Sequence, residues 1–255
     1  MKVIQIVGTS GSGKTTFIES LLPRLVALGT TAVVKHLGHH RFTLAEGKDS
    51  TRFADAGAAV SVAVDDSRSL FIHDTADLER VLELLCDAGT RFAVLEGFKT
   101  RLFSRVVIGD LPSENCVLRN PTVDEVIGSL DRFEDFFTPK GLVEEMTRAD
   151  EGMRTGAILT FTGVVRDRDG DHRTEYLDVD GTIESDLRDI CRDLRKIDGV
   201  EGVGWYHCRG RRYPGEVITC IAILADHRKE GFLAMSRALD VLRRVAAEEK
   251  PGGVE

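Results

Sequence analysis

Short apolar runs alternate with amphipathic stretches along the first half of the chain. Each run has the length and the branched, apolar composition of a buried β-strand. The runs are 3–7, 31–35, 60–64, 92–95 and 105–108. In the stretches 17–28 and 78–85, apolar residues return every three or four positions, as on one face of a helix. This alternation predicts an α/β domain built on a mostly parallel sheet.

The pattern changes in the second half, where longer strand-like runs dominate. These runs are 156–166, 174–179, 203–208 and 217–224. The charged segment 167–173 has Asp169-Gly170 at its centre and predicts a hairpin, with 174–179 as the returning strand. Helical periodicity marks 184–197 and 231–247. Paired strands with two helices predict an α+β domain with a largely antiparallel sheet.

The length of 255 residues fits two domains of ordinary size. We expect the first domain over 1–137, an acidic connector over 138–147 and the second domain over 148–255. A net charge of −8 argues against a nucleic-acid-binding surface. No apolar stretch has membrane-span length, and the chain begins with a predicted strand, so we expect neither a membrane span nor a signal peptide. Five cysteines without C-x-x-C spacing indicate a reducing compartment, so we expect a cytoplasmic protein.

The first strand runs directly into a glycine-rich turn, residues 8–15, and then into a helix. The turn fits G-x-x-x-x-G-K-[ST], and this order of strand, loop and helix is the context of a phosphate-binding loop. Backbone N–H groups would bind phosphate oxygens, Lys14 would add a charge, and Thr15 would bind Mg²⁺. We expect nucleotide contacts from Gly8, Ser10, Gly11, Ser12, Gly13, Lys14, Thr15 and Thr16. The first domain is thus predicted to bind a nucleoside triphosphate.

Glu96 stands directly after the apolar strand 92–95. A P-loop fold needs an acidic residue at that point for its second metal contact, so we expect Glu96 to hold Mg²⁺ together with Thr15. An ordinary strand-end carboxylate would give the same pattern. No Asn-Lys-x-Asp motif for reading guanine occurs in the chain, so the residues alone do not distinguish GTP from ATP.

Three histidines, His36, His39 and His40, follow the second predicted strand. Imidazole suits Zn²⁺, but no Cys or acidic ligand stands nearby at the usual spacing. We therefore interpret them as phosphate contacts or as plain loop residues in preference to metal ligands.

Together these segments resemble the MobB family, the GTP-binding proteins of molybdopterin guanine dinucleotide biosynthesis. The resemblance is carried by 8–15, 34–36, 39–40, 47–50, 56–59 and 95–99. It covers about residues 1–137, with Leu37-Gly38 as a departure from the family's more polar residues. It implies GTP with Mg²⁺, weak hydrolysis, and an accessory role to the guanylyltransferase that attaches GMP to molybdopterin.

Basic residues stand near the predicted strand ends of the second half, among them Arg166, His227 and Arg228. Each of these residues by itself is typical of a solvated surface charge. If their side chains lie close together in the fold, they would bind an anion. The segments around them resemble the MoaE family, the large catalytic subunit of molybdopterin synthase. The resemblance is carried by 156–158, 160–163, 165–166, 207–210, 214–216, 226–228 and Phe232.

The MoaE resemblance implies insertion of sulfur into a pterin substrate, cyclic pyranopterin monophosphate. The sulfur comes from the C-terminal thiocarboxylate of a ubiquitin-like carrier, the small subunit of the synthase. In this chain Arg166, His227 and Arg228 match the substrate-binding positions. Both families imply a homodimer.

The family's two active-site lysines lie seven residues apart, and that spacing falls here on Arg243 and Lys250. Lys250 matches and can serve as nucleophile or acid–base group, while Arg243 keeps the charge but does not transfer a proton. Ala247-Glu248-Glu249 replaces the family's aromatic segment. The sequence therefore predicts either an active sulfurtransferase, with Lys250 and Arg243 as catalytic residues, or a GTP-binding adaptor that binds pterin or carrier without turnover. A small-molecule kinase would need a lid and a base that we do not find.

Overall fold

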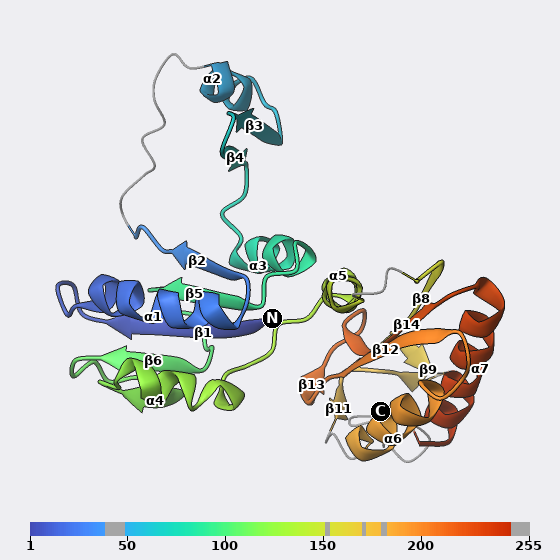
Figure 1. The fold of residues 1–255 in the computed structure, drawn as a ribbon. Coiled ribbons are helices and arrows are strands. Elements are labelled where there is room, and N and C mark those ends of the chain that lie inside the picture. Colours follow the sequence, from blue (N-terminus) through green and yellow to red (C-terminus); the bar gives the residue numbers. More distant parts are fainter. Residues whose placement is uncertain (39–48, 151–153, 170–171, 180–182, 246–255) are drawn as a thin grey trace. The chain divides into compact units, whose positions relative to one another are not determined.

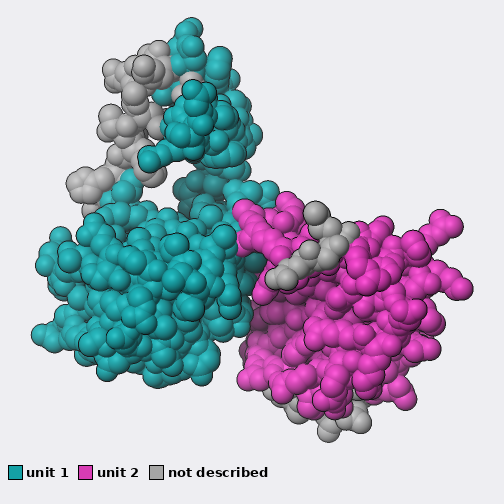
Figure 2. Space-filling model, viewed as in Figure 1, with its two compact units in different colours: residues 1–86, 90–136 teal, residues 87–89, 137–255 magenta. Residues whose placement is uncertain are grey.

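The computed structural model describes residues 1–38, 49–150, 154–169, 172–179 and 183–245. The chain divides into two compact units (Figure 2). Unit 1 comprises Met1–Cys86 and Thr90–Phe136, and unit 2 comprises Asp87–Gly89 and Phe137–Glu255. In the described ranges, no helix is both long and apolar enough to cross a membrane.

Unit 1 is built on a five-stranded parallel sheet (Figure 1). In order across the sheet, the strands are β2 (Thr31–Lys35), β5 (Phe92–Glu96), β1 (Lys2–Gly8), β6 (Arg105–Ile108) and β7 (Cys116–Arg119). The central strand β1 is buried from Val3 to Gly8 because helices cover both faces of the sheet. The predicted α/β architecture is therefore confirmed.

Alternate residues of β1 enter two separate cores. Ile4 and Ile6 pack in the layer of α1 (Lys14–Leu28) and α4 (Val123–Ile127), which a short 3₁₀ helix (Leu130–Arg132) follows. Val3 packs on the other face with α3 (Leu78–Asp87). This two-sided burial explains why the strand reads as a continuous apolar run and not as an alternating one.

Helix α2 (Asp49–Asp55) and strands β3 (Val60–Val64) and β4 (Ser69–His73) form an arm outside the five-stranded sheet. β3 and β4 pair antiparallel, with Val62 opposite Phe71. The Val62 side chain is 44% exposed and that of Phe71 is 67% exposed. One face of the hairpin is thus apolar and open to solvent.

The main sheet of unit 2 is antiparallel, as predicted for an α+β domain. Strand β14 (Val217–Ala225) lies between β12 (Val200–His207) and β8 (Ala157–Val164). Two short ladders join β9 (Arg168–Asp169) to β10 (His172–Arg173) and β11 (Leu177–Val179) to β13 (Gly210–Arg212). The prediction that 174–179 returns alongside 156–166 is wrong, because β11 pairs with β13 and β8 pairs with β14.

Helices cover both faces of this sheet. Helices α6 (Glu184–Leu194) and α7 (Arg228–Val245) pack in one core with Ile221 and Ile223 of β14. Helix α5 (Pro139–Ala149), which takes up most of the expected connector, contacts β12, β14 and β8. A Cβ atom at Gly204 would collide with Met146 of α5, so the glycine allows the helix to lie close to β12.

Candidate functional site

The phosphate-binding loop connects β1 to α1 in unit 1. Gly11 and Gly13 have φ angles of 73° and 88°, a left-handed conformation that glycine adopts without strain. A Cβ atom at Gly8 would collide with the carbonyl oxygen of Ile108 and with the Ser12 hydroxyl. The loop thus has the backbone freedom and the close packing that a ring of inward-pointing N–H groups requires.

Two side chains at the start of α1 are directed by this turn. The Lys14 ammonium donates to the Thr9 carbonyl at 2.6 Å. The Thr15 hydroxyl donates to Oε1 of Glu96 at 3.1 Å, and the Lys35 ammonium lies 3.1 Å from the same oxygen. Glu96 is the last residue of β5 and pairs in register with Lys35 of β2. The strand-end carboxylate and the helix-start hydroxyl are therefore adjacent.

These groups fit a Mg²⁺–nucleotide complex. A carboxylate and a hydroxyl oxygen are ligands that Mg²⁺ accepts, with water and phosphate oxygens filling the remaining positions. The Glu96 side chain is only 11% exposed, so its charge is held in place beside the loop. The bound metal would neutralise phosphate charge, while Lys14 and the backbone N–H groups would bind phosphate oxygens.

The segment after β5 is fixed by a buried glutamine. The Gln5 amide donates to the carbonyls of Gly97 and Phe98 at 2.9 and 2.7 Å. His36 donates its backbone N–H to the Glu96 carbonyl at 2.9 Å, and its ring lies 5.0 Å from that of Phe98. In the parts of the chain that the structure describes, no three potential metal-ligating side chains cluster. His39 and His40 lie outside those parts.

In unit 2, Arg166 follows β8 at one end of the antiparallel sheet. The preceding residue, Val165, donates to the Glu216 carbonyl and accepts from the Gly215 N–H, at 3.0 and 2.8 Å. This pairing continues the ladder beyond Val164, which faces Val217. The Arg166 side chain is exposed, so a cation stands at this end of the sheet.

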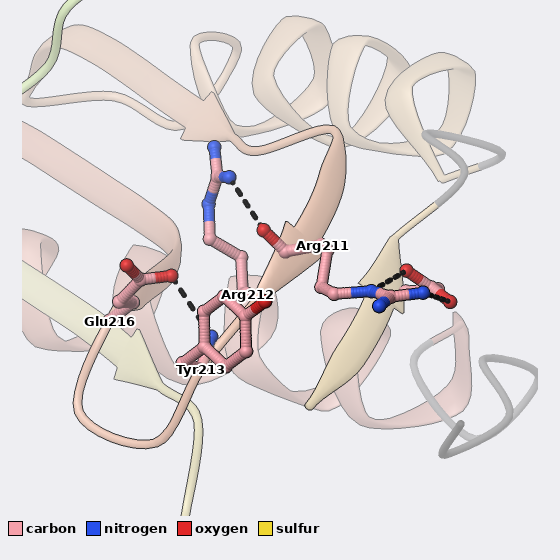
Figure 3. Close-up of polar contacts among 5 residues, drawn as sticks. Arg211, Arg212, Tyr213 and Glu216 are labelled. Atoms are coloured by element: carbon pink, nitrogen blue, oxygen red, sulfur yellow. Dashed lines mark hydrogen bonds and ion pairs between the residues drawn. The ribbon is translucent and has the colours of Figure 1, made fainter. Parts of the chain in front are cut away.

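Strand β13 lies close to this end and brings further arginines (Figure 3). The Arg211 guanidinium pairs with Asp178 at 3.2 Å and lies 3.8 Å from the Tyr176 ring centroid. Arg212 donates to the Arg211 carbonyl at 2.9 Å, and Glu216 accepts from the Tyr213 N–H at 2.9 Å. These arginines are not among the site residues predicted from the sequence, although the basic run Arg209–Tyr213 before Pro214-Gly215 indicates them.

His227 and Arg228 stand at the opposite end of the same sheet. They follow β14, whose last residue, Ala225, pairs with Ala157 at the beginning of β8. From Val217 to Ala225 the strand spans about 27 Å, at roughly 3.4 Å per residue. The fold of one chain therefore does not bring Arg166 together with His227 and Arg228.

Arg243 is separated from Arg228 by the length of α7. The two lie fifteen positions apart on one helix, which corresponds to about 22 Å at 1.5 Å per residue. Arg243 is exposed near the helix C-terminus. Lys250 lies outside the described residues.

Two family models divide the chain between them. The model "Molybdopterin guanine dinucleotide synthesis protein B", MobB, matches residues 3–127, and the model "MoaE protein" matches 136–245. A molybdopterin-guanine dinucleotide biosynthesis adapter protein of Haemophilus influenzae is 30% identical over 49% of this chain and 71% of its own length. A molybdopterin synthase catalytic subunit of Cereibacter sphaeroides is 34% identical over 39% of this chain and 69% of its own length. The chain belongs to both families.

It is thus a fusion of a MobB half and a MoaE half in molybdenum cofactor biosynthesis. A protein of Haloferax volcanii described as a probable molybdopterin synthase is 28% identical over 94% of this chain and 92% of its own length. That match spans both halves, so the same fusion arrangement has a relative of similar length. The predicted family memberships are confirmed.

Proposed function

We propose that the MoaE half is a molybdopterin synthase catalytic subunit. It would transfer sulfur from the thiocarboxylate of a ubiquitin-like carrier to cyclic pyranopterin monophosphate. The main support for this proposal is that two arginine side chains of this half are exposed and, in the part of the chain that the structure describes, unpaired. Arg166 and Arg228 are exposed, and within the described residues no ion pair engages either of them. Each is available to a phosphate ester or to the carrier's terminal carboxyl group.

The separation of these groups points to a site built by two copies of the chain. In a two-fold dimer, Arg166 of one copy can face His227 and Arg228 of the other, because a two-fold interface repeats the same pairing in both directions. This arrangement supports the homodimer that we propose. Arg243 and Lys250 would complete the cationic surroundings, with Lys250 as nucleophile or acid–base group.

The MobB half would bind GTP with Mg²⁺ and assist the guanylyltransferase that forms molybdopterin guanine dinucleotide. Support comes from the contact of Thr15 with Glu96 at the phosphate-binding loop. Hydrolysis would be weak. In the described part of this unit, Glu96 is the carboxylate beside the loop, and its contacts with Thr15 and Lys35 suit it to metal binding more than to activating water.

The apolar face of the arm supports a second contact between copies. Val60, Val62 and Phe71 share this face of a two-stranded hairpin, and such a hairpin is marginal by itself in water. Covering the face with the same face of a second copy would remove apolar surface from water. Replacing Val62 with Asp should raise the dissociation constant of the dimer, measured by light scattering on dilution, whereas Val26→Asp on α1 should not.

A second candidate function is favoured by Arg243. Arginine at this position binds anions but does not release a proton, which suits an adaptor that holds pterin or carrier without turnover. Calorimetry with the pterin separates binding from catalysis. Arg166→Ala or Arg228→Ala should weaken pterin binding about tenfold, more strongly at low salt. An unchanged dissociation constant would make both residues plain surface charges and overturn the anion-site proposal.

We also propose a cytoplasmic location. All five cysteines, Cys86, Cys116, Cys191, Cys208 and Cys220, are free thiols. Thiols remain reduced in the cytoplasm, which is consistent with this location. Mass spectrometry of the protein isolated under acid quench should find no disulfide.

A further inference from the structure

A hollow of about 520 Å³ lies beside the phosphate-binding loop in unit 1. One wall is the face of α1 that carries Thr16, Phe17 and Ser20, and the other is formed by Ile108, Asn120 and Pro121. The hollow begins at Gly13, the residue that precedes Lys14 and the start of α1. A phosphate chain bound to the loop would therefore end at its mouth.

The size and lining of the hollow suit a nucleobase. Small-molecule sites usually have volumes of about 300–1,000 Å³, with apolar walls and few polar groups. Phe17 and Ile108 are half-buried and Pro121 is buried, which provides apolar surface for a planar ring. The Ser20 hydroxyl is occupied, because it donates to the Thr16 carbonyl at 3.0 Å. Thr16, at the start of α1, is expected to contact phosphate, which leaves Asn120 as the lining side chain with hydrogen-bonding capacity toward a base.

The orientation of the Asn120 amide follows from the backbone around it. Its Oδ1 atom accepts from the Gly109 N–H at 2.6 Å, and in an amide side chain only the oxygen can accept from an N–H group. The Asn120 N–H in turn donates to the Val107 carbonyl at 2.8 Å. The residue has a φ of 47°, which asparagine tolerates better than most residues. The Nδ2 group is therefore the part of the amide that is left to bind a ligand.

A neighbouring arginine holds the same loop in place. The Arg119 guanidinium donates to the carbonyls of Gly109 and Leu111 at 3.0 and 3.1 Å. The acceptor side of the Asn120 amide and the loop that it binds are thus fixed before any nucleotide arrives. A preorganised donor discriminates between ligands more strongly than a mobile one.

We propose that this hollow is the nucleobase site of the MobB half and that Asn120 selects guanine over adenine. The Nδ2 group can donate only. Both purines have an acceptor at N7, but guanine has the acceptor O6 where adenine has its N6 amino donor, so the discrimination lies at that position. Two donors facing each other leave both without a partner, which disfavours adenine. This inference rests on the proposed nucleotide binding and adds the base and the residue that reads it.

The test is competition binding of GTP, ATP and inorganic triphosphate to the full-length protein. We expect wild type to prefer GTP over ATP by about tenfold, the size of one hydrogen bond gained and one donor clash avoided. In Asn120→Asp, the carboxylate still accepts from Gly109 but presents an acceptor to the base. The ratio should fall to about one or below, while the affinity for triphosphate stays nearly unchanged because the phosphate contacts are intact.

Asn115→Asp is the matched control. Asn115 also has a positive φ, 54°, and precedes the opposite end of β7, where its amide donates to the Leu102 carbonyl. The Asn115→Asp variant should leave the preference for GTP over ATP unchanged. Ser20→Trp provides an independent variant, because a large side chain at this position would fill the hollow. It should weaken GTP binding at least tenfold and leave triphosphate binding unchanged.

Three results would overturn the inference. These are equal affinities for GTP and ATP in wild type, an unaltered ratio in Asn120→Asp, and full GTP affinity in Ser20→Trp. If neither nucleotide nor triphosphate bound to wild type, the proposed phosphate-binding function would itself fail, and the base site would fall with it.

Discussion

Thr15 and Glu96 are 81 positions apart in the sequence, and a hydrogen bond of 3.1 Å joins them at the end of the parallel sheet. The contact exists because β5 pairs with β1 in parallel, so Glu96 lies next to Ile6 and close to the loop that follows β1. Parallel strands end at the same edge, which is where open α/β sheets bind their ligands. The contact places a hydroxyl and a carboxylate side by side at the loop, and it is the reason that we propose a metal site there.

Replacement of Glu96 with Gln should make nucleotide binding nearly independent of Mg²⁺. The amide keeps the size of the side chain and one acceptor for Thr15, but it loses the charge that attracts the cation. Affinity measured in Mg²⁺ should fall about tenfold, and affinity in excess chelator should not change. Glu19→Gln, an exposed position on α1, is the control and should behave as wild type. An unaltered Mg²⁺ dependence in Glu96→Gln would remove Glu96 from the metal site.

Replacement of Lys14 with Ala should lower the affinity for GTP about a hundredfold. It removes a charge-assisted contact with phosphate oxygens that the neighbouring N–H groups cannot replace. Arg24→Ala removes a cation from the same helix, where it pairs with Asp124, and should leave binding unchanged. Calorimetry gives both dissociation constants. Equal affinities for wild type and Lys14→Ala would argue against a phosphate-binding loop.

Mixing the two weakened variants, Arg166→Ala and Arg228→Ala, tests whether each anion site uses two copies of the chain. If Arg166 of one copy acts with Arg228 of the other, a dimer of Arg166→Ala with Arg228→Ala contains one intact site and one doubly altered site. Random exchange of equal amounts should then restore about a quarter of the wild-type pterin-binding stoichiometry. Each variant alone should show only the tenfold weaker binding, with no sites of wild-type affinity. Absence of recovery in the mixture, with exchange verified by mass spectrometry, would place each site within a single chain.

The Cys191 thiol should be unreactive at neutral pH. Burial raises its pKa from the ordinary 9.0 to about 11. At pH 8 such a thiol is ionised in about one molecule in a thousand, and the thiolate is the reactive form. Iodoacetamide should therefore modify the partly exposed Cys116 well before Cys191, as peptide mass spectrometry would detect. Modification of both at equal rates in folded protein would contradict the burial of Cys191.

The same shift gives the direction of a pH effect on stability. The folded state favours the neutral thiol. The contribution of Cys191 to the free energy of unfolding is therefore fully present below pH 9 and is lost as the pH rises toward 11. The unfolding temperature of Cys191→Ala should consequently fall less steeply between pH 9 and pH 11 than that of wild type. A steeper fall of the unfolding temperature in Cys191→Ala than in wild type would mean that ionised Cys191 is stabilised in the folded protein.

Local signals predicted the phosphate-binding loop well. The apolar run of β1, the glycines of the turn and the periodicity of α1 all lie within 28 residues, so no distant contact is needed to read them. The position of Glu96 at the end of β5 could likewise be read from the apolar residues before it. Its contact with Thr15 depends on which strands are neighbours, and the P-loop pattern made that neighbourhood predictable.

Long-range pairing accounts for what the sequence did not reveal. β11 and β13 have three residues each, which is too short for a periodicity signal, so the pattern of residues 174–179 does not identify β13 as their partner. The separation of Arg166 from His227 depends on the register of β8 against β14. Their shared MoaE resemblance predicted a common site, but it did not indicate that the two groups lie at opposite ends of the sheet in one chain.

The central claim, that the MoaE half is a working sulfurtransferase, is tested most directly by single-turnover conversion of cyclic pyranopterin monophosphate to molybdopterin. The reaction would contain the full-length protein and a thiocarboxylated carrier, beside Lys250→Ala and the surface control Arg192→Ala. We expect product with wild type and with Arg192→Ala, and a loss of at least a hundredfold in rate with Lys250→Ala. Pterin binding without any product from wild type would contradict the claim and leave the adaptor function.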